Sequence, residues 1–94
     1  MYRIILVDDE FWTLRGIEQT FPWGKYGMEV ASCFTSAQKA LASIEKLRPA
    51  AIFTDIRMPG ISGLDMLKNL RKRGFTTEVV IISGFSEFQY AQAA

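Results

Sequence analysis

The chain has 94 residues, of which 49% are apolar and 22% are charged, and 11 Lys+Arg against 10 Asp+Glu give a formal net charge of +1. This length predicts one domain, 1–94, with a small core, and the charge provides no global attraction to nucleic acid. No apolar run approaches the roughly 20 residues that span a bilayer, and no signal-peptide layout opens the chain. The single cysteine, Cys33, excludes an internal disulfide. We therefore expect a soluble cytoplasmic protein without a membrane partner.

Apolar runs predict four strands in chain order. The first strand is expected at 4–7, the third at 51–54 and the fourth at 79–82, where continuous aliphatic residues are typical of strands covered on both faces. The segment 29–34 alternates more, as an edge strand does.

Residues at helical spacing predict helices between these strands. Capping-box patterns at 35–38, 62–65 and 86–89 mark helix starts, and the last opens a helix that continues to the end of the chain. The predicted inner faces are Phe11, Leu14, Ile17 and Phe21 in the first helix; Ala37, Ala40, Leu41, Ile44 and Leu47 in the second; and Leu64, Leu67 and Leu70 in the third.

Three further features are interpreted as structural. We expect Trp12 and Trp23 to pack, Cys33 to be a small core residue, and the basic run 71–73 to be a solvated helix end.

Strictly alternating strands and helices predict an α/β fold, a doubly wound parallel sheet with right-handed crossovers. The three most apolar strands should be central and the second should lie at an edge, which gives the strand order 2-1-3-4. Strand 2 lies on one side of strand 1 and strand 3 on the other, so the order in which strands are added across the sheet reverses there. A crevice should therefore open between the carboxyl ends of strands 1 and 3. We expect Asp8, Asp9 and Asp55 to project there.

Converging carboxylates repel one another unless a cation intervenes. The sequence contains no histidine, so the available ligands are the oxygens of Asp8, Asp9, Asp55 and loop carbonyls. Hard oxygen ligands select Mg²⁺, with Mn²⁺ as a substitute, over zinc or copper.

A phosphoryl-acceptor site is the chemistry that this arrangement favours. Ser83 and Gly84 end the fourth strand, so the serine hydroxyl and the glycine N–H could bind phosphoryl oxygens. Asp55 would be the nucleophile and would form an acyl phosphate. Taken singly, Asp55 could be only a turn former, Asp8-Asp9 only a helix N-cap and Ser83-Gly84 only a loop. Their joint placement at three adjacent strand ends favours a site.

The sequence resembles the receiver domain of two-component response regulators. Residues 4–10, with their acidic pair, resemble the first strand of that family. Residues 54–60 together with 62–65 resemble its phosphoacceptor loop, and 80–84 its fourth strand with the switch hydroxyl. The segment 83–91 is similar to the subgroup that carries an AraC-type helix-turn-helix output domain.

This resemblance implies a flavodoxin-like fold and a mechanism. Asp55 would take a phosphoryl group from the phosphohistidine of a sensor histidine kinase. Asp9 and the Arg57 carbonyl would bind Mg²⁺ with Asp55, and Asp8 would assist through water. Ser83 would move toward the phosphoryl group and shift the fourth-strand face between two populations.

The resemblance also implies a regulatory domain rather than an enzyme, apart from self-phosphorylation from small donors and slow autodephosphorylation. The parent protein would regulate transcription and bind DNA through an output domain outside this chain. The family's domain continues through a fifth strand bearing a Lys-Pro and a fifth helix, so we expect 1–94 to be incomplete at its C-terminus.

An incomplete sheet would expose 79–82 as an apolar edge. We therefore predict a homodimer, strand exchange or aggregation through the fourth strand. A non-phosphorylated interaction module with the same fold is the principal alternative function. A Mg²⁺-dependent phosphatase would require an Asp-x-Asp pattern after the first strand, which Asp8-Asp9-Glu10 lacks.

Overall fold

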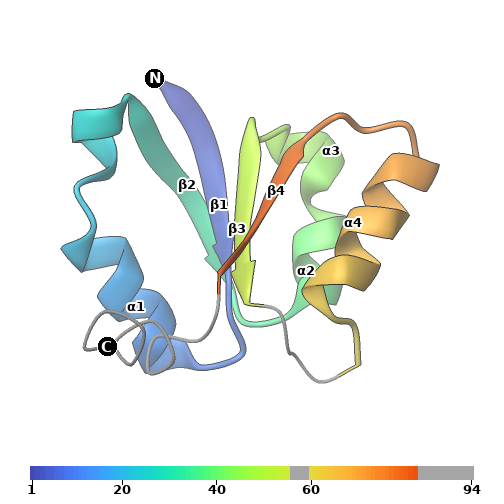
Figure 1. Cartoon of the computed structure of the whole chain (residues 1–94), viewed down its shortest axis with the longest axis horizontal. Helices are drawn as coiled ribbons and strands as arrows, with labels where there is room; N and C mark the ends of the chain where they lie inside the picture. The colour runs from blue at the N-terminus through green and yellow to red at the C-terminus, as the bar shows by residue number, and fades with distance from the viewer. Residues whose placement is uncertain (56–59, 83–94) are drawn as a thin grey trace, which may run out of the picture.

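The computed structural model describes residues 1–55 and 60–82 of the chain. Helices lie on both sides of a central sheet, with α1 and the 3-10 helix η1 on one face and α2, α3 and α4 on the other (Figure 1). The elements are, in chain order, β1 (Tyr2–Val7), α1 (Phe11–Thr20), η1 (Trp23–Tyr26), β2 (Met28–Phe34), α2 (Ala37–Ala42), α3 (Ile44–Leu47), β3 (Ala51–Asp55), α4 (Gly63–Lys72) and β4 (Glu78–Ile82).

The four strands form one parallel sheet in the order β2-β1-β3-β4, which confirms the predicted order. The pairing register places Val7 beside Thr54 and Thr54 beside Ile81. The carboxyl ends of three strands therefore reach the same level, and the residues that follow them meet at one edge of the sheet.

Successive side chains of a strand face opposite sides, so each central strand contributes to two core clusters. Ile5, Ile52 and Val79 face α2, α3 and α4, whereas Ile4 and Phe53 face α1 and η1. The buried members of the first cluster are Ile5, Val7, Ala37, Ala40, Leu41, Ile44, Ile52, Met66 and Leu70, and those of the second are Ile4, Leu6, Leu14 and Trp23.

Both ends of α4 are closed by local hydrogen bonds. The predicted capping box is confirmed: the Asp65 N–H donates to Ser62 Oγ at 3.1 Å, and the Ser62 N–H donates to Asp65 Oδ2 at 3.2 Å. At the other end Gly74 has φ 87°, and the Gly74 and Phe75 N–H groups donate to the Arg71 and Leu70 carbonyls. This is a Schellman motif, and it explains why the helix stops at the predicted glycine.

The prediction of one continuous helix over 37–47 is wrong, because Ser43 divides it into α2 and α3. The Ser43 hydroxyl donates to the Lys39 carbonyl at 3.1 Å, and the Ser43 N–H donates to Ala40 rather than to the residue four positions back. The predicted capping box at 35–38 is also displaced by one residue. Ser36 is the N-cap and accepts a bond from the Lys39 N–H, and a lysine has no acceptor with which to reciprocate.

Two predicted helix faces are only partly correct. In α4 Leu64 is 48% exposed, and the side chains that pack inward are Met66 and Leu70. In α1 Leu14 is buried, whereas Phe11 is 52% exposed. Ten-residue helices placed along a small sheet bury only a narrow stripe, so apolar spacing alone overstates the inner face.

The two tryptophans differ. Trp23 packs as predicted, with its ring centroid 5.0 Å from that of Phe53 and 4.5 Å from that of Phe21. Trp12 is 81% exposed and makes an edge contact with Phe11, so its predicted packing role is wrong for the core. Cys33 is half-buried against the second cluster, as expected for a small core residue.

None of the helices in the described ranges combines the length and apolar character that crossing a membrane requires. The helix predicted to begin at 86 lies outside the described residues.

Candidate metal centre

Asp8, Asp9 and Asp55 meet at the carboxyl edge of the sheet. Each offers one carboxylate oxygen, and these atoms lie within 4.8 Å of one another. Asp8 and Asp9 directly follow β1, and Asp55 ends β3, so the pairing of Val7 with Thr54 brings them to one level. The expected convergence is therefore present in the fold.

The three carboxylates have different surroundings. Asp8 is 3% exposed, Asp55 is half-buried and Asp9 is exposed. The pKa of Asp8 is raised from 3.8 to about 6, mainly by burial and to a smaller extent by the charges of Asp55 and Asp9, against the lowering effect of the Glu10 N–H. That N–H donates to Asp8 Oδ1 at 2.9 Å and orients the carboxylate.

The simpler interpretation of the acidic pair as a helix cap is wrong. The N-cap residue of α1 is Glu10, which makes no side-chain capping bond. The Asp8 N–H instead continues the ladder by donating to the Phe34 carbonyl at 3.1 Å. Asp8 and Asp9 thus precede the helix and are directed by the strand.

Thr54 and Gly63 fix the backbone beside Asp55. Thr54 is fully buried, and its hydroxyl donates to the Asp55 carbonyl at 3.0 Å. A Cβ at Gly63 would lie 2.8 Å from the Asp55 carbonyl oxygen and 3.1 Å from Thr54 Cγ2. Only glycine therefore allows the first turn of α4 to approach the end of β3 this closely.

Neither residue is among the predicted site residues, although both lie in the segments, 54–60 and 62–65, that resemble the phosphoacceptor loop. Local pattern alone predicts Gly63 as the second residue of a capping box and Thr54 as the last residue of a strand. These are weak signals. A glycine at the start of a helix or a threonine before a strand-end carboxylate does not indicate which backbone atoms will pack against it in the fold.

The cluster fits a hard divalent cation. Three carboxylates at this separation, one of them with a raised pKa, repel one another, and a cation between them would relieve that repulsion. All the donors are oxygens, which suit Mg²⁺. The part of the chain that the structure describes therefore contains an acidic cluster able to hold a metal ion.

Three predicted site residues cannot be placed. Arg57, Ser83 and Gly84 lie outside the described residues. Cys33, which pairs with Leu6 on β1, is not a member of the acidic cluster. Burial, followed by the charge of Glu18, raises the pKa of the Cys33 thiol to about 11. A thiol with that pKa is protonated at neutral pH and is a poor metal ligand or nucleophile.

Comparison with known proteins places this geometry in a family. Residues 4–94 match the family described as the response regulator receiver domain. Among curated proteins, the chain is 32% identical over 94 residues to the uncharacterized transcriptional regulatory protein YesN of Bacillus subtilis, and 31% identical over 93 residues to the transcriptional regulatory protein HptR of Staphylococcus aureus. The match with YesN covers 100% of this chain and 26% of YesN, and the match with HptR covers 99% of this chain and 36% of HptR. This chain therefore spans about a third or less of these relatives.

Solved structures agree. The receiver domain of AraT, a response regulator from Geobacillus stearothermophilus, superposes with a TM-score of 0.78 at 30% identity over 99% of this chain and 72% of that one. A two-component transcriptional regulator AraC from Clostridium phytofermentans superposes with a TM-score of 0.79 at 29% identity over 100% of this chain and 73% of that one. The sequence match over 4–94 and the shared four-stranded order agree on the same conclusion, and this chain belongs to the response regulator receiver domain family of two-component systems.

Proposed function

We propose that the chain is a phosphoacceptor switch in which Asp55 receives a phosphoryl group in a Mg²⁺-dependent reaction. The observation that carries this proposal is the meeting of three carboxylates within 4.8 Å, with Asp55 at the end of a central strand. A strand-end carboxylate held by its own backbone contacts is a fixed nucleophile, and the two other acids provide a cation site beside it.

The transfer is a displacement at phosphorus. One Asp55 carboxylate oxygen attacks the phosphorus of a phosphohistidine, the O–P bond forms, the N–P bond breaks, and the electron pair of that bond stays on the imidazole nitrogen. A bound Mg²⁺ would supply positive charge to the phosphoryl oxygens during this step. Asp8, Asp9 and Asp55, with the Arg57 carbonyl, would hold the ion, and the Ser83 hydroxyl and the Gly84 N–H would bind the phosphoryl oxygens.

The acyl phosphate would act as a signal rather than as a step of turnover. Ser83 follows β4, so a hydroxyl drawn toward the new phosphoryl group would pull on the end of that strand. We propose a sensor histidine kinase as donor and a transcriptional output in the whole protein, since HptR and YesN are named as transcriptional regulators. Contact with DNA would come from an output domain outside this chain. On this proposal the domain is not an enzyme, although small phosphodonors would label it and the label would be lost slowly.

Labelling with a small phosphodonor tests the proposal. Acetyl phosphate with Mg²⁺ should add one phosphoryl group by intact mass, and beryllofluoride with Mg²⁺ should shift the amide resonances of residues after β1 and β3. Asp55→Asn should abolish both effects, and Glu45→Gln, which removes one exposed carboxylate on α3, should abolish neither.

Asp9→Asn separates the metal from the nucleophile, because it leaves Asp55 in place and should weaken labelling through Mg²⁺. A wild-type chain that neither binds Mg²⁺ nor takes a label would overturn the proposal and leave the non-phosphorylated interaction module.

A further inference from the structure

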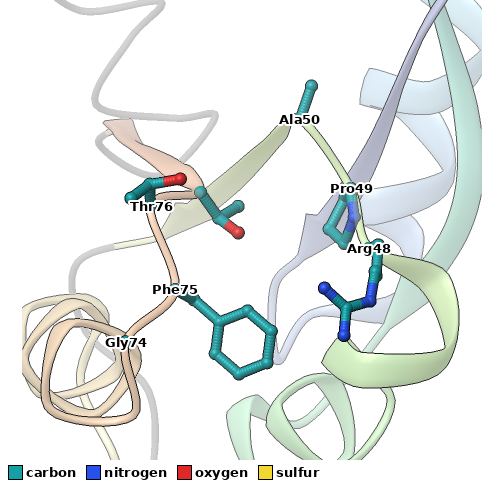
Figure 2. A pocket seen from close by; sticks show the side chains of 7 residues that line it. Arg48, Pro49, Ala50, Gly74, Phe75 and Thr76 are labelled. Carbon is teal, nitrogen blue, oxygen red and sulfur yellow. The ribbon is translucent and has the colours of Figure 1, made fainter.

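A notch opens at the amino edge of the sheet, at the opposite ends of the strands from the acidic cluster. It is a cavity of about 270 Å³ between the loop that precedes β3 and the loop that joins α4 to β4. Figure 2 shows the Arg48 guanidinium and the Phe75 ring facing one another across it. We call it the Arg48 notch; its lining residues are Arg48, Pro49, Ala50, Gly74, Phe75, Thr76 and Thr77.

Arg48 is positioned by the backbone but is not engaged by a carboxylate. It ends α3 in the left-handed conformation, with φ 42° and ψ 59°, and its N–H donates to the Ile44 carbonyl. Its guanidinium carbon lies 5.9 Å from the centroid of the Phe75 ring. Within residues 1–55 and 60–82, no side chain forms an ion pair or a hydrogen bond with this guanidinium.

The two neighbouring arginines, Arg71 and Arg73, already donate hydrogen bonds to backbone carbonyls. Arg71 donates to the Phe75 carbonyl at 2.9 Å, and Arg73 donates to the Leu41 carbonyl at 3.2 Å while lying 5.2 Å from the Phe75 ring centroid. They hold the loop that forms one wall of the notch. Arg48 therefore differs from them in having its donors directed to solvent in the notch.

Two hydroxyls line the same space. Thr76 is exposed and Thr77 is 9% exposed, and neither hydroxyl bonds to another residue in the described part of the chain. Each can donate one hydrogen bond. Pro49 and the Phe75 ring supply the apolar part of the wall (Figure 2).

The balance of charge at this edge favours an anion. The carbonyl end of α4 points toward it and carries about half a negative charge, and the single turn of α3 contributes less. Arg48, Arg71 and Arg73 carry three full positive charges beside those ends. Of the residues that the structure describes, the acid next to the notch is Glu78, which is exposed and follows Thr77. Three full positive charges exceed this single negative charge and the partial charges of the helix ends, so the balance at the notch is positive.

We propose that the Arg48 notch binds the phosphate group of a small phosphate monoester. A guanidinium presents two parallel N–H donors that match a phosphate, and the Thr76 and Thr77 hydroxyls that line the same cavity could donate to further oxygens of a tetrahedral group. Phosphate fits this donor set because it accepts in several directions at once. The Phe75 and Pro49 wall would contact the organic part of the ligand.

Amide chemical-shift titration of the whole chain, without divalent metal, tests the proposal. Inorganic phosphate and phenyl phosphate are the two probes, and the absence of metal prevents phosphate from being held at the acidic cluster through a cation. Both should shift the resonances of 48–50 and 74–77, with dissociation constants on the order of 1 mM, and phenyl phosphate should bind several-fold more tightly. Equal affinity would identify free phosphate as the ligand rather than an ester.

Arg48→Gln should weaken binding of either probe about tenfold, and Arg48→Lys should weaken it less because the charge remains. Lys46→Gln is the matched control, since it removes one exposed positive charge from the same helix, and it should leave the affinity within about twofold. If Arg48→Gln does not fold, Thr76→Ala provides the same test at an exposed position.

Two results would overturn the proposal. One is the lack of any shift at 48–50 and 74–77 in high-millimolar probe. The other is an affinity that falls equally in Arg48→Gln and Lys46→Gln, which would show diffuse attraction to a basic surface rather than a defined site.

Discussion

The two edges of the sheet are built from the same strands but use their residues differently. At the carboxyl edge, Asp8 and Asp55 crowd like charges together, and the first turn of α4 lies so close that Gly63 has no room for a side chain. At the amino edge, Arg71 donates to the Phe75 carbonyl after α4, and Arg73 donates to the Leu41 carbonyl of α2.

This contrast distinguishes residues whose arrangement serves the candidate metal site from residues whose contacts stabilise the fold. Arrangements that destabilise the fold, such as a buried carboxylate with a raised pKa, occur at the carboxyl edge. The contacts of Arg71 and Arg73 at the amino edge stabilise it. Removing the crowded charge of Asp8 should therefore stabilise the metal-free chain, whereas removing the contacts of Arg71 or Arg73 should destabilise it.

Gly63→Ala should produce the largest effect. The new Cβ would meet the Asp55 carbonyl oxygen at 2.8 Å, and because that atom belongs to the backbone the start of α4 must move. We expect a loss of about 1–3 kcal/mol in the free energy of unfolding, together with weaker Mg²⁺ binding. Urea denaturation and Mg²⁺ titration would measure the two effects.

Gly16→Ala is the matched control, because a Cβ there meets no atom within 4 Å and the residue lies inside α1. It should stabilise the chain by about 0.5–1 kcal/mol. Equal effects of the two substitutions would show that the close approach at Gly63 is not a constraint.

Stability should also depend on pH through Asp8. The pKa of this carboxyl is about 6 in the folded chain against 3.8 ordinarily, so between these values the native state binds more protons than the unfolded state. The free energy of unfolding should therefore fall as pH rises from about 4 through 6. Two pKa units correspond to an upper limit of about 3 kcal/mol, which solvent screening reduces to about 1 kcal/mol.

Thermal unfolding at a series of pH values in metal-free buffer would measure this slope. Asp8→Asn should flatten it, and saturating Mg²⁺ should also flatten it, because a bound cation keeps the carboxyl ionised. A slope that persists unchanged in Asp8→Asn would assign the effect to another group.

The N-caps of the helices on the same face of the sheet offer a smaller comparison. Ser62 both accepts from the Asp65 N–H at 3.1 Å and donates its own N–H to Asp65, whereas Ser36 only accepts, at 3.4 Å. Ser62→Ala should cost about 1 kcal/mol, and Ser36→Ala about half of that. Chemical denaturation of both variants in parallel would show the difference, and a larger loss at Ser36 would contradict it.

These cases show which features of the fold and of the site can be predicted from the sequence. Periodicity predicts the four strands and their order, and turn residues predict both ends of α4, because these depend on local chemistry. Carboxylates at strand ends predict the acidic cluster, since parallel strands share one edge.

Close approaches across the fold do not follow from local pattern. The space available at Gly63 depends on how near α4 lies to β3, and the exposure of Leu64 depends on how far the helix extends beyond the sheet. The break at Ser43 arises from a serine that bonds its own helix, which apolar spacing does not record.

The smallest expected effect on stability concerns β4, the outermost strand on its side of the described sheet. Val80 is 38% exposed, and no strand in residues 1–55 and 60–82 pairs with its outer edge. Unpaired backbone groups along an apolar strand favour pairing with a second chain, so we predict concentration-dependent dimers or larger species.

Val80→Lys should change the free energy of unfolding by less than about 0.5 kcal/mol, because the side chain already meets solvent. It should nevertheless shift the sedimentation profile toward the monomer, since a lysine on an edge strand opposes edge-to-edge pairing. Trp12→Lys, at a position 81% exposed on α1, is the control for a general gain in solubility. If both substitutions abolish association equally, or if the wild-type chain is monomeric at high concentration, the edge of β4 is not the contact.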